Sequence, residues 1–266
     1  MAGLAAGPAL VVYAMSMWAD DTRTTEELFQ ASLQGDYEDE AAWDAVGALR
    51  LRKTEEVFQW AVRYCESAIP LERARGLDVL AQLGMHPDQC VAIAIEHLRD
   101  PEARVVDSAA WALAHLRGDA AISALIQMRQ YSDPDVRWAV ANGLHGSERP
   151  DAIATLIELM EDGDDNVRDW ATFGLGQGEV DSPEIRDALR KRLNDSYEDA
   201  RAEGIWGLAR RRDERGLRML IEDLGDPEHG RGHEAAAADT LGLPSDTPAE
   251  QLCDGLRKLL ADYFPR

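Results

Sequence analysis

The chain has 266 residues, 45% of them hydrophobic, and a formal net charge of −22 at pH 7. The apolar content is enough for a continuous core and excludes a wholly disordered chain. The negative charge disfavours DNA, RNA and anionic lipid as partners and favours a basic partner, with solubility alone as the alternative explanation.

The first 21 residues form an extension ahead of the repeats described below. Its apolar run, residues 9–18, is too short to span a bilayer, and no Lys or Arg precedes it, so it makes a poor signal peptide. We expect this extension to be either disordered or the result of a wrongly assigned start, with Met15 or Met17 as the true one. The folded part is expected to span residues 22–266 of a cytoplasmic protein with no membrane partner.

Apolar residues recur at helical spacing in eight segments, which we call A helices. In one of them, Ile153, Leu156, Ile157 and Met160 fall at i, i+3, i+4 and i+7 and form one stripe. The predicted A helices are residues 24–34, 54–67, 87–99, 119–131, 150–161, 182–193, 213–224 and 248–262. The last of them is expected to cap the array.

A second helix, which we call a B helix, is predicted between each A helix and the next. Its clearest copy runs from Asp164 to Gly176, with an acidic turn, a Val-Arg pair and a Leu seven places after the Arg. Equivalents of this Arg position recur every 31 or 33 residues: Ala42, Arg73, Val106, Arg137, Arg168, Arg201 and Glu234. A fixed period of this length is typical of a stacked helical solenoid.

The connections carry the residues that start and end helices. Candidate N-caps followed by Pro start the B helices, and glycines stand where B helices end. The N-cap pairs are Asp100-Pro101, Asp133-Pro134 and Asp226-Pro227, and the glycines are Gly84, Gly118 and Gly146.

The phrase Asp-x-x-Val-Arg-x-x-Ala-x-x-x-Leu resembles the HEAT repeat of the bilin-lyase-like type over residues 22–262. Residues 166–173, 182–187 and 200–208 resemble more specifically the bacterial YibA-like HEAT proteins. The first resemblance implies an all-α, right-handed α-solenoid of about seven HEAT repeats, whose B helices line a concave groove. The second implies immunity against the toxic C-terminal domains of Rhs polymorphic toxins.

One side of each B helix is apolar and is expected to form the core, with Val136, Val140 and Leu144 as examples. The opposite side is predicted to be exposed, and it carries five of the seven tryptophans and several acidic residues. Outward positions also include Trp43, Asp44, Asp78, His145, Gln177 and Asp239. The candidate protein-binding residues are Trp111, Trp138, Asn142, Trp170, Phe173, Trp206, Asp107, Asp169, Glu203 and His115.

These columns predict a groove that binds another protein, with tryptophans as anchors and carboxylates that meet Lys or Arg. The alternative is that curvature of the solenoid packs the rings against one another. We expect the chain to be an immunity protein whose partner is a basic toxin domain. We also expect it to be a monomer when free and to use no cofactor. A general assembly scaffold that uses the same groove is the second hypothesis.

Enzymatic functions have weaker support. A di-iron hydroxylase of this fold uses several His-Glu pairs, but only His233-Glu234 is present, and Cys65, Cys90 and Cys253 show no metal or disulfide spacing. A DNA glycosylase of this fold would need a basic surface. A bilin lyase follows only from the general resemblance.

Two groups of arginines have structural interpretations. Arg137 and Arg168 are expected to bond to turn carboxylates of adjacent repeats and form a ladder. The run Arg210-Arg211-Arg212 is predicted to be a solvated turn, with a local anion site as the alternative.

Overall fold

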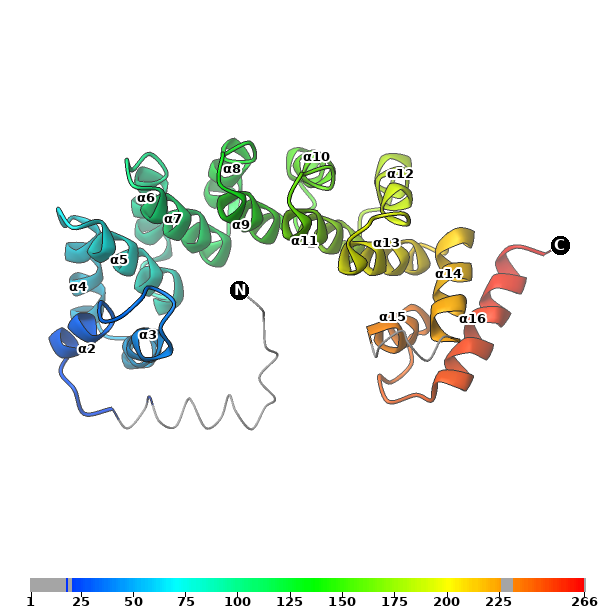
Figure 1. Cartoon of the computed structure of the whole chain (residues 1–266), viewed down its shortest axis with the longest axis horizontal. Coiled ribbons are helices and arrows are strands. Elements are labelled where there is room, and N and C mark those ends of the chain that lie inside the picture. Colours follow the sequence, from blue (N-terminus) through cyan, green and yellow to red (C-terminus); the bar gives the residue numbers. More distant parts are fainter. Residues whose placement is uncertain (1–17, 19–20, 226–231, 266) are drawn as a thin grey trace. The chain divides into compact units, whose positions relative to one another are not determined.

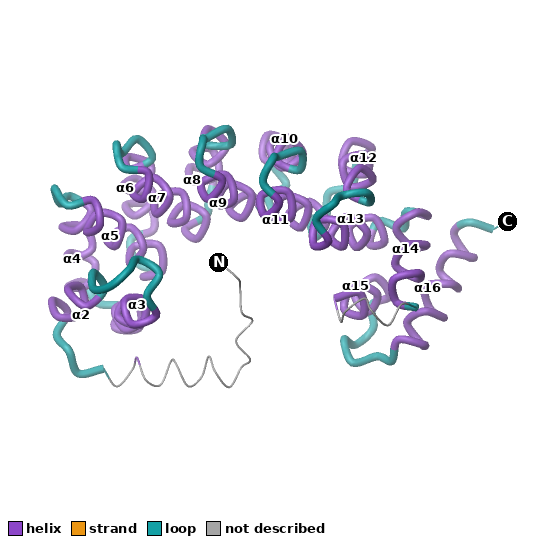
Figure 2. The backbone as a smooth tube through the Cα atoms, viewed as in Figure 1, coloured by secondary structure: helices purple, strands orange, loops and turns teal. Residues whose placement is uncertain are grey.

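The protein is described by a computed structural model, which places Trp18 and residues 21–225 and 232–265. Within these residues the chain is helical with no strand (Figures 1 and 2). The A helices are α2 (Thr25–Ala31), α4 (Glu55–Cys65), α6 (Pro87–His97), α8 (Asp119–Gln127), α10 (Pro150–Leu159), α12 (Pro183–Arg192), α14 (Glu214–Leu224) and α16 (Ala249–Tyr263). The B helices are α3 (Glu40–Arg52), α5 (Pro70–Leu83), α7 (Ala103–Leu116), α9 (Pro134–Leu144), α11 (Asp165–Gly176), α13 (Glu198–Arg210) and α15 (Gly232–Leu241). The predicted alternation of A and B helices is confirmed.

The chain divides into two compact units, which we call unit 1 (Met1–Gln127) and unit 2 (Met128–Arg266). In unit 1, α5 packs between α3 and α7. In unit 2, α11 packs between α9 and α13, and α16 closes the end by packing on α14 and α15. The N-terminal extension, apart from Trp18 and Asp21, and the Asp226-Pro227 pair lie outside the described residues.

The apolar side of the B helices forms the core, as predicted. Val136, Val140 and Leu144 of α9 are fully buried, and the equivalent Val167 and Ala171 of α11 are buried as well. The period of the sequence therefore identifies the buried side of each B helix correctly.

Of the two predicted N-caps that lie within the described residues, one is confirmed and one is wrong. Asp133 caps α9 by accepting a hydrogen bond from the Asp135 amide, and Pro134 occupies the first helical turn. Asp100, however, does not cap α7, which begins two residues after Pro101 with Glu102 as its N-cap. Its carboxylate instead accepts the Glu102 amide and binds Arg73.

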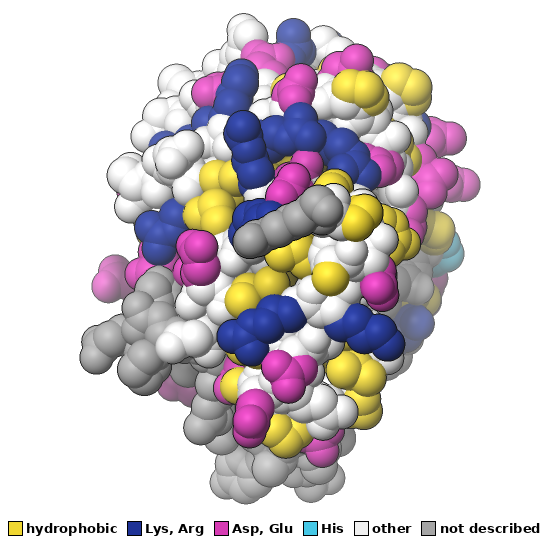
Figure 3. All heavy atoms as spheres, turned by 90° about the vertical axis from the view of Figure 1, so that its right-hand side faces the viewer, with side chains coloured by type: hydrophobic (Ala, Val, Ile, Leu, Met, Phe, Trp, Pro, Cys, Tyr) yellow, Lys and Arg dark blue, Asp and Glu magenta, His cyan; other side chains and the backbone are white. Residues whose placement is uncertain are grey.

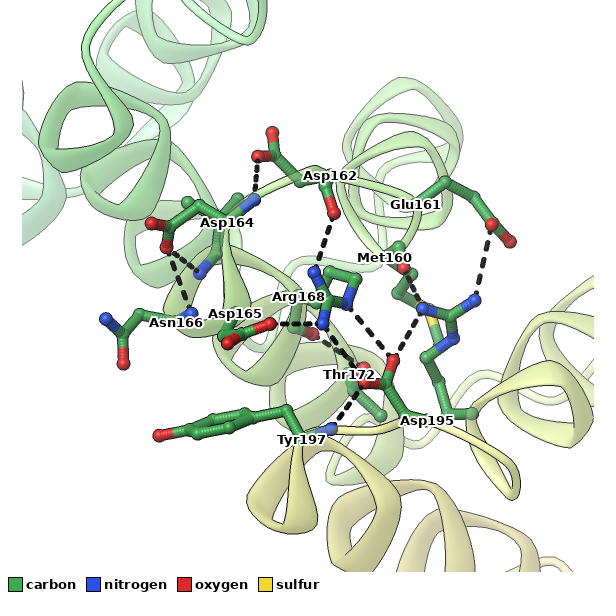
Figure 4. Close-up of polar contacts among 12 residues, drawn as sticks. Met160, Glu161, Asp162, Asp164, Asp165, Asn166, Arg168, Thr172, Asp195 and Tyr197 are labelled. Atoms are coloured by element: carbon green, nitrogen blue, oxygen red, sulfur yellow. Dashed lines mark hydrogen bonds and ion pairs between the residues drawn. The ribbon is translucent and has the colours of Figure 1, made fainter.

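The predicted arginine ladder is present and joins consecutive repeats. Arg137 donates from Nε and Nη2 to the two carboxylate oxygens of Asp162, at 2.7 and 2.8 Å. Arg168 makes the same fork with Asp195, at 3.1 Å for both bonds (Figure 4). Each guanidinium also donates Nη1 to carbonyls of its own A-to-B turn. The ladder therefore stacks repeats and orders their turns together.

The prediction of a solvated turn at residues 210–212 is wrong. The side chain of Arg211 is 5% exposed, and its guanidinium donates to five backbone carbonyls. Four of these carbonyls belong to residues 175–180, the end of α11 and the loop after it. Burial lowers the pKa of this guanidinium. The physical reason is that a helix end leaves carbonyls unpaired, and one arginine satisfies several of them.

Candidate functional site

The outward residues of α9, α11 and α13 form a surface that we call the unit 2 face. Its members are Trp138, Asn142, Asp169, Trp170, Phe173, Glu203 and Trp206. All of them are partly exposed, as the helical period predicts. Whether a partner binds them remains a prediction.

The aromatic rings of the unit 2 face contact one another. Trp138 and Trp170 meet edge to face with ring centroids 5.1 Å apart, and Trp170 meets Phe173 at 5.6 Å. Phe173 in turn stacks on His145 at 4.8 Å. Such contacts hold the rings in place while leaving part of each exposed. The rings therefore pack against one another and still present a surface that a partner could contact.

A hydrogen-bonded tryptophan and a hollow lie next to this row of rings. The Trp206 indole donates to Asp239 at 3.1 Å. Beside Phe173 lies a hollow of about 320 Å³, whose walls include His145, Ile153 and Gln177. The row of rings therefore borders a pocket at one end.

Two carboxyl groups of the unit 2 face lie where their ionisation is unfavourable. Burial, with the negative charges of Asp169 and Asp199 nearby, raises the pKa of Glu203 to about 8. Burial, with the charge of Asp199, raises the pKa of Asp169 to about 6. Glu203 Oε2 is buried and accepts no hydrogen bond from the described residues. Ionisation of these groups is therefore unfavourable until a positive charge comes close.

The outward residues in unit 1 behave differently. Trp111 packs on Trp43 at 6.0 Å and on His115 at 4.0 Å. Asp107 already binds Arg104 at 2.9 Å. Trp111 and Asp107 are partly exposed and His115 is exposed, but the carboxylate of Asp107 has a cation of its own.

Asp78 is not outward as predicted, because the connection between α2 and α3 covers it. The Tyr37 hydroxyl donates to Asp78 at 2.6 Å, and Asp78 is 1% exposed. Arg75, also buried, binds Asp78 and lies over the ring of Tyr37. The connection that carries Tyr37 is longer than the other A-to-B connections between described residues. This length is the feature of the sequence that could have indicated the covering of Asp78.

Trp18 covers α3 in a similar way. Its indole donates to Asp44 at 2.9 Å, and its ring lies on Gly47, where an added Cβ would be 2.8 Å from ring atoms. Gly47 stands at the helical position that Trp111 and Phe173 hold in later repeats. The face of unit 1 is thus partly covered by its own chain, and the unit 2 face is the stronger candidate site.

The described residues lack two further features. No helix among them has the length and apolarity needed to cross a membrane. Across residues 21–225 and 232–265, no group of three or more His, Cys, Asp or Glu side chains is arranged to hold a metal ion.

Comparison with known proteins identifies relatives of this architecture. The chain is 36% identical to protein YibA of Escherichia coli strain K12 over 90 residues, which are 34% of this chain. The match spans about a third (32%) of YibA. The X-ray structure of E. coli YibA superposes over 95% of both chains with a TM-score of 0.72 at 22% identity, which establishes a common fold.

A larger structure also shares the fold. Kap95p, from a structure in which it binds RanGDP, has a TM-score of 0.60 at 11% identity, over 95% of this chain and 43% of that one. The family description "HEAT repeats" matches residues 64–144, 91–176, 122–199 and 153–241, more than half of the chain. This fold is an α-solenoid whose extended surfaces serve as protein-binding scaffolds. The chain therefore belongs to the HEAT-repeat family.

Proposed function

We propose that the chain is a non-enzymatic immunity protein that neutralises a basic toxin domain by binding it on the unit 2 face. The observation that carries the proposal is the pair Asp169 and Glu203, two carboxylates with raised pKa values beside a row of partly exposed rings. A Lys or Arg of a partner placed between them would remove their electrostatic cost. The same face offers the aromatic anchors that protein interfaces favour.

The anchors are expected to supply most of the binding energy. Trp138 and Trp170 are held by mutual contact, so little side-chain entropy is lost when a partner covers them. Each such tryptophan contributes roughly 2 kcal/mol or more at an interface, and truncation of both is expected to weaken binding about 100- to 1,000-fold. The carboxylates add orientation and speed of association.

The toxin as partner is supported by the YibA-like phrases in residues 166–173, 182–187 and 200–208 and by the similarity to YibA. The net charge of −22 complements a basic protein such as a nuclease domain, which must itself attract nucleic acid. Occlusion of the toxin's own binding surface would then be the mechanism of neutralisation.

A growth assay tests the proposal. The chain is expressed with the candidate toxin domain encoded beside its gene, and survivors are counted. We expect rescue by the wild type and loss of rescue by the variant with Trp138→Ala and Trp170→Ala. Binding of the same variant to the purified, catalytically inactive toxin domain is measured in parallel.

Trp60→Ala is the matched control, because Trp60 is also partly exposed but lies on the A helix α4. Circular dichroism checks that each variant folds. Rescue by the folded double variant as strong as that of the wild type would contradict the use of the unit 2 face. Absence of rescue by a folded wild type would favour the assembly-scaffold hypothesis instead.

A further inference from the structure

The positive charge of this acidic chain is concentrated in one segment of unit 2. Residues 183–218 contain ten of the 28 Lys and Arg residues and only eight of the 50 Asp and Glu residues. Figure 3 looks onto the side of the molecule where the C-terminal helices lie, and Lys and Arg side chains gather there with a few carboxylates among them. A local positive surface on a chain of net charge −22 calls for an explanation.

Four arginines of this segment line one hollow. Its volume is about 610 Å³, within the range typical of small-molecule sites. The lining residues are Arg186, Asp187, Arg190, Arg212, Asp213, Glu214, Arg215 and Phe264. They come from α12, from the turn before α14, from the start of α14 and from the residue after α16. No residue of the unit 2 face lines this hollow.

The three carboxylates in the hollow are already bonded to arginines. Arg190 donates to Asp187 and to Asp213, each at 2.7 Å. Glu214 accepts from Arg218 at 2.6 and 3.0 Å. The acidic groups of the lining are therefore neutralised by partners within the protein.

Two arginines of the lining, in contrast, keep N–H groups that bond to no described residue. Among the described residues, Arg212 donates from Nη1 alone, to the Thr240 carbonyl. The guanidinium of Arg215 is exposed and makes no hydrogen bond or ion pair to any described residue. Free guanidinium donors beside a hollow of this size are suited to oxyanions, which they bind with charge-assisted hydrogen bonds.

We propose that this hollow binds an organic phosphate, with the phosphate on Arg212 and Arg215 and the organic part against the ring of Phe264. A phosphate offers several acceptor oxygens, which match donors that come from two different arginines. The ring of Phe264 is partly exposed in the same hollow and provides an apolar wall for the remainder of the ligand. This site is separate from the proposed toxin-binding face, so either proposal can fail without the other.

Isothermal titration calorimetry in a phosphate-free buffer tests this site with three probes: pyrophosphate, adenosine monophosphate and citrate. We expect the two phosphates to bind and citrate to bind more weakly. Arg215→Ala should weaken both phosphates about tenfold, which is the usual scale for one charge-assisted contact. Phe264→Ala should weaken adenosine monophosphate and leave pyrophosphate unchanged, because only the nucleotide has a part that can rest on the ring.

Lys191→Ala is the matched control, since Lys191 is a cation of α12 that binds Glu161 and does not line the hollow. It should leave both affinities unchanged. Failure of the wild type to bind either phosphate, or equal binding by Arg215→Ala, would overturn the proposal. Citrate binding as tight as that of pyrophosphate would overturn the assignment to phosphate, and an unchanged nucleotide affinity in Phe264→Ala would overturn the role of the ring.

Discussion

Glu203 shows how a single carboxylate on the unit 2 face links pH to stability. Its ordinary pKa is 4.5 and its pKa in the folded chain is about 8, so between these values the folded chain holds a proton that the unfolded chain has lost. The contribution of Glu203 to the free energy of unfolding therefore falls as the pH rises from 4.5 to 8. We expect Glu203→Gln to raise the melting temperature at pH 8 by about 2–4 °C and to have little effect near pH 5, measured by thermal unfolding.

Glu222→Gln provides the control, because Glu222 is an exposed carboxylate on α14. It should leave the melting temperature unchanged at both pH values. An equal change of melting temperature in the two variants would show that the pKa of Glu203 is not raised by its surroundings. Because a nearby cation favours the ionised form of a carboxyl group, binding of a basic partner should also release protons from Asp169 near pH 6 and from Glu203 between pH 6 and 8.

Arg168 is the residue on which the ladder of unit 2 depends most directly. Its side chain is 12% exposed and its partner Asp195 is 4% exposed, so removal of the guanidinium takes two hydrogen bonds from a buried carboxylate, which keeps only its bond to Arg192 at 2.9 Å and a backbone amide among the described residues. We expect Arg168→Ala to lower the free energy of unfolding by about 2–4 kcal/mol, measured by urea denaturation. Arg257→Ala, which breaks an exposed pair with Asp254, should change it by less than about 0.5 kcal/mol.

At the scale of helices, the close approach of α11 and α13 depends on two glycines. A Cβ added to Gly207 would lie 2.8 Å from the Cα of Gly176, which is backbone and cannot move aside cheaply. We expect Gly207→Ala to push the two helices apart and to cost about 1–3 kcal/mol of stability, measured by urea denaturation. Gly163→Ala has open space around the added methyl group and should be close to neutral. A Gly207→Ala variant as stable as the wild type would show that the helices can shift freely.

The helices themselves were predictable because their signals are periodic. Val136 and Val140 mark the buried side of α9, and the repeated Arg137 and Arg168 indicated the ladder, since each recurs in a fixed place. The helix start at Ala103 was less predictable, because Asp100 is held by Arg73 from the preceding repeat. A local N-cap rule does not include such a partner.

The candidate site could be predicted only in part for a related reason. The exposed side of each B helix follows from its period, which placed Trp138 and Trp170 correctly. The coverage of Asp78 by Tyr37, and of Gly47 by Trp18, depends on residues that lie outside the repeated A and B helices and follow no period. Contacts of that kind are decided by loop length and three-dimensional fit, which one sequence does not encode in a simple pattern.

At the scale of the whole molecule, charge governs how a partner arrives. A net charge of −22 attracts a basic protein over a distance set by the ionic strength, which screens it beyond roughly 10 Å at 0.1 M salt. If the proposed toxin domain is the partner, its association rate should fall about tenfold or more between 50 and 500 mM salt, measured by stopped-flow fluorescence. The dissociation rate should change much less.

Trp138→Ala is the informative comparison, because it removes an anchor without changing the charge. It should speed dissociation and leave the dependence of association on salt unchanged. An association rate that does not respond to salt would contradict electrostatic attraction as the source of speed.

The ladder also has a direction along the chain. Asp162 and Asp195 each accept a backbone amide in their own turn and a guanidinium from the preceding repeat. Each arginine is 25 or 27 residues ahead of its aspartate, so during synthesis the cation leaves the ribosome first. Every new turn of unit 2 that carries such an aspartate can therefore close on a partner that is already in place. Such an order favours folding that proceeds from one repeat to the next while the chain is still being made.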